Sequence, residues 1–205
     1  MKYHKLGKLP IETINFFLEE ILKRKQTNVP YQWVQFDEKL HLEFLKIFSN
    51  TELKIQKNSA NTHYIQKAFY SEPGYGFRIH KDGMNCRSAL NIVLSCNTSD
   101  WVRWYDEDYI NKITSTPVVA TFYKNFGSSR NIDIFEYENI EFTEELQVEI
   151  GDVYALDVGT YHSFKCVGSL PRIIIQTKFE NFPNFETINK SLSKNSFSNL
   201  IISRT

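Results

Sequence analysis

The sequence predicts a mainly β fold with N-terminal helices, in the form of a double-stranded β-helix, the jelly roll found in cupins. Three observations predict it. Apolar residues recur at helical spacing within the first fifty residues. From about residue 62 onward, short alternating segments are bounded by Gly, Pro and Ser turns. No helical pattern separates these segments, which favours antiparallel sheets with the helices packed on one of them.

The same pattern divides the chain into three regions. Residues 1–61 form a helical region that packs on the sheet, residues 62–180 form the β-helix core, and residues 181–205 form a Ser/Asn-rich tail. Pro10 is suited to the start of the first helix, because its missing N–H has no partner to lose there. Asp37 is expected to cap a second helix.

Composition excludes several classes of protein. Lys+Arg and Asp+Glu both number 24, so the neutral chain has no general attraction to nucleic acid, which is an unlikely partner. The three cysteines include no CxxC pair, so neither a zinc knuckle nor a disulfide framework is indicated. No apolar run approaches the roughly 20 residues of a membrane span, and the N-terminus lacks a signal-peptide core. A cytoplasmic protein without a membrane partner is expected.

The segment "GFRIHKD" (76–82) ends on a histidine with an aspartate two residues later. In a strand, residues i and i+2 point to the same face, so His80 and Asp82 can converge on one point. His162, which opens "HSFKCV" after a Gly-Thr turn, is the best third ligand. Two imidazoles and one carboxylate form the facial set that holds Fe(II) in mononuclear non-haem oxygenases and leaves other positions open.

Arg172 begins the very apolar segment "RIIIQTKFE" (172–180). An arginine at the start of a buried strand is costly unless it meets an anion. Its guanidinium matches a carboxylate with two parallel hydrogen bonds. A dicarboxylate that chelates iron at one end and reaches Arg172 with the other fits this arrangement, and 2-oxoglutarate is such a molecule. Pairing of Arg172 with a core-edge carboxylate such as Asp157 is the alternative.

The order "HKD" at 80–82, His162, and Arg172 ten residues later resembles the HxD…H…R pattern of the Fe(II)/2-oxoglutarate-dependent oxygenases. The likeness covers about residues 62–180. "GDVYALDVGTYHSF" is similar to the family's approach to the distal histidine. "DGMNCRSALNIVL" resembles the aspartyl/asparaginyl β-hydroxylase branch and small phage and microbial members, although that branch can lack the carboxylate that Asp82 supplies.

The resemblance implies a function. Fe(II), 2-oxoglutarate and O₂ would be consumed with release of succinate while an unactivated C–H bond of an amino acid, a peptide residue or a small metabolite is hydroxylated. Ascorbate is a further candidate, as a reductant. Related halogenases typically lack the carboxylate ligand, so Asp82 favours hydroxylation. The irregular section 109–138 is expected to shape access of the small-molecule or peptide substrate.

Two further residues have a functional and a structural interpretation. Asn91 lies within "ALNIVL", where it either donates to 2-oxoglutarate or is a satisfied core amide. Tyr70 lies ten residues before His80, where prolyl-hydroxylase-like relatives use a tyrosine near the cosubstrate, or it is a core tyrosine. Two rival functions stay open: a metal-binding cupin that does not use 2-oxoglutarate, and a non-catalytic jelly-roll binding module.

Overall fold

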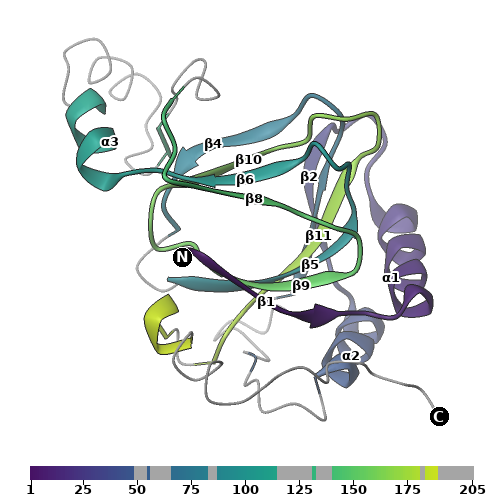
Figure 1. Cartoon of the computed structure of the whole chain (residues 1–205). Helices are drawn as coiled ribbons and strands as arrows, with labels where there is room; N and C mark the ends of the chain where they lie inside the picture. The colour runs from purple at the N-terminus through teal and green to yellow at the C-terminus, as the bar shows by residue number, and fades with distance from the viewer. Residues whose placement is uncertain are drawn as a thin grey trace.

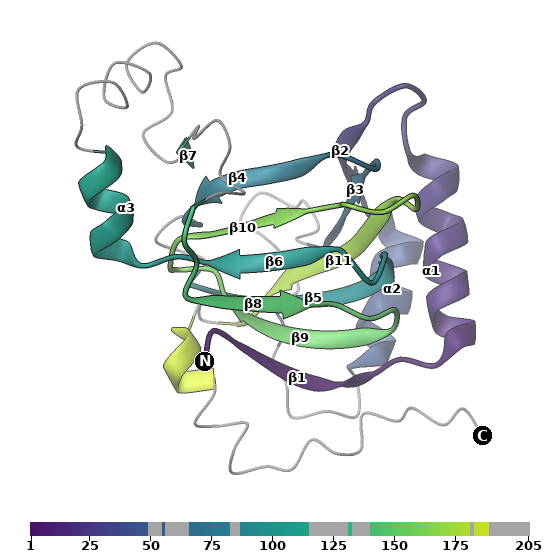
Figure 2. The same ribbon diagram turned by 45° about the horizontal axis from the view of Figure 1, so that its top comes forward.

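The computed structural model describes residues 1–48, 55, 66–82, 87–114, 131–132, 140–180 and 183–188. Two antiparallel sheets face each other, and Figures 1 and 2 show helices α1 (Ile11–Arg24) and α2 (Glu38–Ile47) on the far side of the larger one. This arrangement confirms the predicted jelly roll with helices on one sheet. Within the described residues, no helix is long and apolar enough to cross a membrane.

The larger sheet has six strands, in the spatial order β1 (Tyr3–Lys8), β9 (Asp152–Asp157), β5 (Ser88–Ser95), β11 (Arg172–Lys178), β3 (Lys67–Ser71) and β2 (Tyr31–Gln35). The smaller sheet has five, in the order β7 (Asn131–Ile132), β4 (Gly76–His80), β10 (His162–Lys165), β6 (Trp101–Trp104) and β8 (Glu144–Gln147). Neighbouring strands come from distant parts of the chain, so residues far apart in sequence meet between the sheets.

The helices begin where the sequence predicts. Pro10 immediately precedes α1. The Asp37 carboxylate accepts a hydrogen bond of 2.8 Å from the backbone N–H of Leu40, which satisfies one of the donors left unpaired at a helix start. The apolar face of both helices then packs on the larger sheet, where Phe17 and Phe44 share a core cluster with Ile175. The helices therefore cover the side of that sheet that faces away from the sandwich interior.

A second core lies between the two sheets. It includes Val93 and Ile174 of the larger sheet, and Trp104 and Phe164 of the smaller one. Neighbouring residues of one strand belong to different cores, since Ile174 faces the sandwich interior while Ile175 faces the helices. This is the alternation expected of a strand buried on both faces.

The N-terminal region, which the sequence predicts to be helical, also contains two strands. Strands β1 and β2 lie at the two edges of the larger sheet, where β1 pairs with β9 and β2 pairs with β3. Strand β8 and helix α3 (Glu107–Thr114) were missed as well. The boundaries proposed after residues 61 and 180 lie at or beside residues outside the described part, as does most of the 109–138 section.

The packing between helices and sheet gives a testable prediction. Ile175 is fully buried in the core shared by the helices and β11. We expect Ile175→Ala to lower the free energy of unfolding by about 2–5 kcal/mol, because it removes apolar contacts and leaves a cavity. Urea denaturation measures this value. Leu22→Ala on α1 is the control: Leu22 is 41% exposed, so its loss should cost less than about 1 kcal/mol. If both substitutions lowered the free energy of unfolding equally, the assignment of Ile175 to the buried core and Leu22 to the exposed face would be wrong.

Candidate active site

The two sheets enclose a cavity of about 420 Å³ that both of them line. One wall is aromatic and includes Phe69 of the larger sheet with Phe77 and Phe164 of the smaller one. The rings of Phe77 and Phe164 are stacked with centroids 6.3 Å apart. Five of the six residues predicted to form a site line this cavity: His80, Asp82, Asn91, His162 and Arg172. Tyr70 is the exception.

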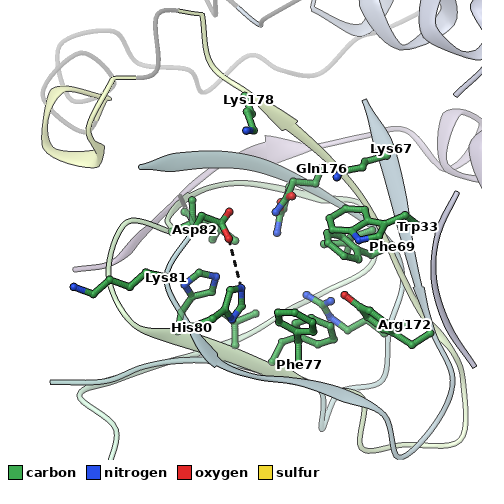
Figure 3. A pocket seen from close by; sticks show the side chains of 18 residues that line it. Trp33, Lys67, Phe69, Phe77, His80, Lys81, Asp82, Arg172, Gln176 and Lys178 are labelled. Atoms are coloured by element: carbon green, nitrogen blue, oxygen red, sulfur yellow. Dashed lines mark ion pairs between the residues drawn. The ribbon is translucent and has the colours of Figure 1, made fainter. Parts of the chain in front are cut away.

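His80, Asp82 and His162 meet at one end of the smaller sheet. His80 is the last residue of β4 and His162 the first of β10, and the two face each other directly in the antiparallel register. Asp82 follows β4, where its backbone N–H donates to Val158 O at 2.9 Å. One ligand atom from each of the three side chains lies within 4.8 Å of the others. Figure 3 shows Asp82 Oδ1 beside His80 Nε2, at 3.5 Å.

The environment of His162 suits a metal ligand. Its Nδ1–H donates to the carbonyl of Thr160 at 2.9 Å, which leaves the lone pair of the ring on Nε2. Burial, reinforced by the neighbouring His80, lowers the pKa of His162 to about 4. The imidazole is therefore neutral at pH 7, the form that coordinates a metal. Three such donors are a suitable set for a first-row divalent ion.

Arg172 lies in the same cavity at the start of β11, with 2% of its surface exposed. Among the described residues, no acceptor lies within hydrogen-bond distance of its Nε or Nη1 atoms. The guanidinium stacks over Phe164, 4.4 Å from the ring centroid. Burial lowers the pKa of Arg172. Two such donors on a buried cation are suited to hydrogen bonding with an anion.

The carboxylates of Asp157 and Asp100 do not pair with the Arg172 guanidinium. Asp157, the alternative partner, forms an ion pair with Lys2 at 3.1 Å. Asp100 attracts Arg172 and acts against the fall in its pKa, yet its own oxygens accept from the backbone N–H groups of Asn97 and Val167 at 2.9 and 2.8 Å. The interpretation of Arg172 as one half of an internal ion pair with Asp157 is therefore wrong.

The prediction that Tyr70 lies near the cosubstrate is also wrong. Tyr70 belongs to the helix-side core, and its hydroxyl is 3.5 Å from Glu72 Oε1. It occupies the face of β3 opposite Phe69, which lines the cavity. Tyr31 of β2 lines the cavity instead. The sequence-based prediction did not include it because β2 was not expected as a strand. The alternation in "YQWVQ" was the available signal.

Tyr31 and Arg172 occupy one row across three strands. Arg172 pairs with Ser71, and Ser71 pairs with Tyr31. Burial raises the pKa of Tyr31 well above its usual range, so its hydroxyl remains a donor at neutral pH. The cationic fork of Arg172 and this phenol thus line the same part of the cavity.

Asn91 points into the cavity from β5, opposite Gln176 of β11. It is 6% exposed, and its Oδ1 has no hydrogen-bond partner among the described residues. A fully satisfied core amide would not leave a buried acceptor unpaired. The geometry therefore favours the interpretation of Asn91 as a ligand contact.

Neither a protein-family model nor a curated protein matches the sequence. Solved structures do match its fold. Viral collagen prolyl hydroxylase vCPH from Paramecium Bursaria Chlorella virus-1, in its 2-oxoglutarate complex, is similar at a TM-score of 0.52 and 12% identity, over 87% of this chain and 95% of that one. The chain has the fold of the 2-oxoglutarate-dependent oxygenases.

HygX from Streptomyces hygroscopicus supports the same assignment of the fold. Its structure with nickel and 2-oxoglutarate is similar at a TM-score of 0.53 and 9% identity, covering 87% of this chain and 82% of HygX. A second HygX structure, which also contains hygromycin B, matches at a TM-score of 0.53 and 10% identity over the same shares of the two chains. At such identities the likeness concerns the oxygenase fold, and the function must be argued from the site.

The unmatched donors of Arg172 give a prediction about stability. We expect Arg172→Met to raise the free energy of unfolding of the cofactor-free protein by about 1–3 kcal/mol, because two buried donors without acceptors are removed. Chemical denaturation measures the change. Arg103→Met is the control, since Arg103 Nε donates to Glu145 Oε2 at 2.6 Å, and its loss should lower stability by up to about 1 kcal/mol. A clearly less stable Arg172→Met protein would show that this arginine already has its partners.

Proposed function

We propose that this protein is an Fe(II)- and 2-oxoglutarate-dependent dioxygenase that hydroxylates an unactivated C–H bond of an amino acid, a peptide residue or a small metabolite. The observation that carries the proposal is the sharing of one cavity by a His-Asp-His cluster and a buried arginine with unmatched donors. The cluster fits iron, and the arginine fits the far carboxylate of a chelating dicarboxylate. Neither feature alone specifies 2-oxoglutarate.

In this proposal His80, Asp82 and His162 hold the iron from one side. When bound, the iron supplies the activation of O₂ that is coupled to decarboxylation of 2-oxoglutarate to succinate. The Thr160 carbonyl keeps the proton of His162 on Nδ1, so that Nε2 faces the metal. Asp82 occupies a ligand position that a halide would need, which favours hydroxylation over halogenation. Ascorbate remains a candidate reductant.

Arg172 binds the C5 carboxylate of 2-oxoglutarate through its two unmatched nitrogens, and Tyr31 donates a further hydrogen bond from the same row of the sheet. Asn91 offers its Nδ2–H groups to the other end of the cosubstrate. The aromatic wall keeps the dielectric low around Arg172, which strengthens its attraction for a carboxylate. The structures of vCPH and HygX, which were determined with 2-oxoglutarate, support this assignment, and the hygromycin B bound to HygX supports a small-molecule substrate.

The metal assignment leads to a first prediction for this function. We expect His80→Ala and His162→Ala each to weaken Fe(II) binding by about 100-fold or more, because each removes one of three ligands. Anaerobic calorimetric titration with Fe(II) measures the affinity. His4→Ala, on edge strand β1, is the matched control and should bind iron normally. Melting curves should stay close to wild type, and unchanged iron binding in either ligand variant would remove His80 or His162 from the site.

The arginine gives the second prediction. Arg172→Lys keeps the charge and loses the two-pronged fork, so we expect 2-oxoglutarate to bind at least about tenfold more weakly, or about 1.4 kcal/mol. Arg172→Ala should bind more weakly still, because the carboxylate would lie unpaired among apolar groups. The measurement is anaerobic 2-oxoglutarate titration of the Fe(II) protein, followed by calorimetry and by the visible charge-transfer band.

Arg103→Lys is the matched control for that titration, since Arg103 pairs with Glu145 outside the cavity. It should leave 2-oxoglutarate binding unchanged. If wild type, Arg172→Lys and Arg172→Ala all bind 2-oxoglutarate equally well, Arg172 is a structural residue. A metal-binding cupin that does not use 2-oxoglutarate then becomes the better description.

A further inference from the structure

Helix α3 lies at the end of the smaller sheet where the His-Asp-His cluster forms. Figures 1 and 2 show it beside the ends of β4 and β6, apart from α1 and α2. Asp106 caps the helix, since its Oδ1 accepts a hydrogen bond of 2.7 Å from the Tyr109 N–H. Tyr105, the residue before this cap, donates its N–H to the carbonyl of Tyr161 at 3.0 Å. The helix therefore begins next to the segment that carries His162.

Two polar contacts join α3 to the segments that carry the proposed ligands. Glu107 forms an ion pair with Lys81, the residue between two of these ligands, and Figure 3 shows the Lys81 side chain pointing away from the cavity. Asn111, one turn further along α3, accepts a hydrogen bond of 3.2 Å from the hydroxyl of Tyr161, which precedes His162. The ammonium of Lys81 also lies over the ring of Tyr161, 4.4 Å from its centroid. One face of α3 thus contacts the segment after β4 and the start of β10.

An apolar contact accompanies the polar ones. Ile110 of α3 is fully buried and shares a core cluster with Ile79 of β4 and with Tyr105. Tyr161 is partly buried against the same cluster. Ile79 directly precedes His80, and neighbouring side chains of a strand point to opposite faces. The ligand side chain therefore faces the cavity, while the side chain beside it faces α3.

Helix α3 depends on this docking for its stability. It has eight residues, and isolated helices shorter than about 12–15 residues are marginal in water. The ion pair contributes little by itself, since the Glu107 side chain is 54% exposed. The burial of Ile110 is the larger contribution, because it removes a whole apolar side chain from water. Docking of α3 is thus an equilibrium that residues beside the proposed metal ligands control.

We infer that Ile110 and Glu107 are positioning residues of the metal site, and that docking of α3 and binding of iron favour each other. The inference rests on the proposed function and adds a supporting element to the same site. The docked helix holds Lys81 and Tyr161, and with them the backbone on which the ligands lie. Coupling of this kind is reciprocal: the factor by which undocking weakens iron binding equals the factor by which bound iron suppresses undocking.

Hydrogen exchange tests the coupling in the wild-type protein. The peptide that covers residues 107–114 is followed by mass spectrometry without metal and with saturating Fe(II), under anaerobic conditions. Labelling times are kept shorter than global unfolding, so that local opening is measured. Iron should slow exchange in α3 about tenfold and leave the peptide that covers α2 unchanged. His80→Ala, which lacks one proposed ligand, is the control and should show no slowing in α3.

Anaerobic calorimetric titration with Fe(II) gives the reciprocal measurement. Ile110→Ala should weaken iron binding about fivefold or more, and Ile110→Val should restore most of the affinity. Ile175→Ala is the matched control, because it truncates another fully buried isoleucine, in the helix-side core away from the cluster. Its iron affinity should equal that of wild type, which separates positioning of the ligands from a general loss of stability.

A surface variant keeps the test informative if Ile110→Ala does not fold. Glu107→Gln removes the ion pair with Lys81 without touching the core. It should weaken iron binding about two- to threefold, in line with the modest strength of an exposed ion pair. Glu43→Gln on α2 is the matched control, since it removes the ion pair with Lys46 on the far side of the larger sheet. Its iron affinity should equal that of wild type.

Two results would overturn the inference alone. In one, wild type binds Fe(II) while α3 exchanges at the same rate with and without it. In the other, the α3 variants bind iron as tightly as their matched controls. If wild type itself does not bind Fe(II), the proposed function is overturned, and this inference with it. The iron titration of wild type therefore separates the two failures.

Discussion

The alternation of side chains along β11 is the constraint on which the rest of this structure depends. The strand lies between β3 and β5, buried on both faces. Ile173 and Ile175 anchor the helices, while Arg172, Ile174 and Gln176 line the cavity. A slip of one residue would bury the guanidinium under the helices and place isoleucines in the site. The helix-side core therefore holds the register of β11, and that register places the functional side chains.

Antiparallel pairing of β4 and β10 likewise positions the proposed metal ligands. His80 ends one strand and His162 begins its neighbour, and the register sets them side by side with ring centroids 4.2 Å apart. The Asp82 N–H holds the segment after β4 against Val158. Because these positions are set by backbone hydrogen bonds, the fold itself brings the three side chains together. Such preorganisation reduces the cost of ordering the site on binding.

The cavity contains buried polar groups that cost stability wherever they lack a partner. Arg172 and Asn91 both have buried polar atoms without partners among the described residues, and each such group costs free energy. The aromatic wall around them increases that cost, since it excludes water. A ligand that pairs with these groups would remove that free-energy cost on binding. Strain of this kind is typical of sites selected for function rather than stability.

Local patterns in the sequence determined much of this protein. The start at Pro10, the Asp37 cap, the alternation in β5 and β11, and the pairing of His80 with Asp82 depend on residues close together in the chain. Only the tertiary structure decided that Tyr31 rather than Tyr70 faces the cavity and that β1 and β2 complete the larger sheet. Short edge strands carry a weak local signal, because their stability comes from hydrogen bonds to strands distant in sequence. Alternation likewise shows which residues share a face, whereas the packing of the two sheets and the helices decides which face encloses the site.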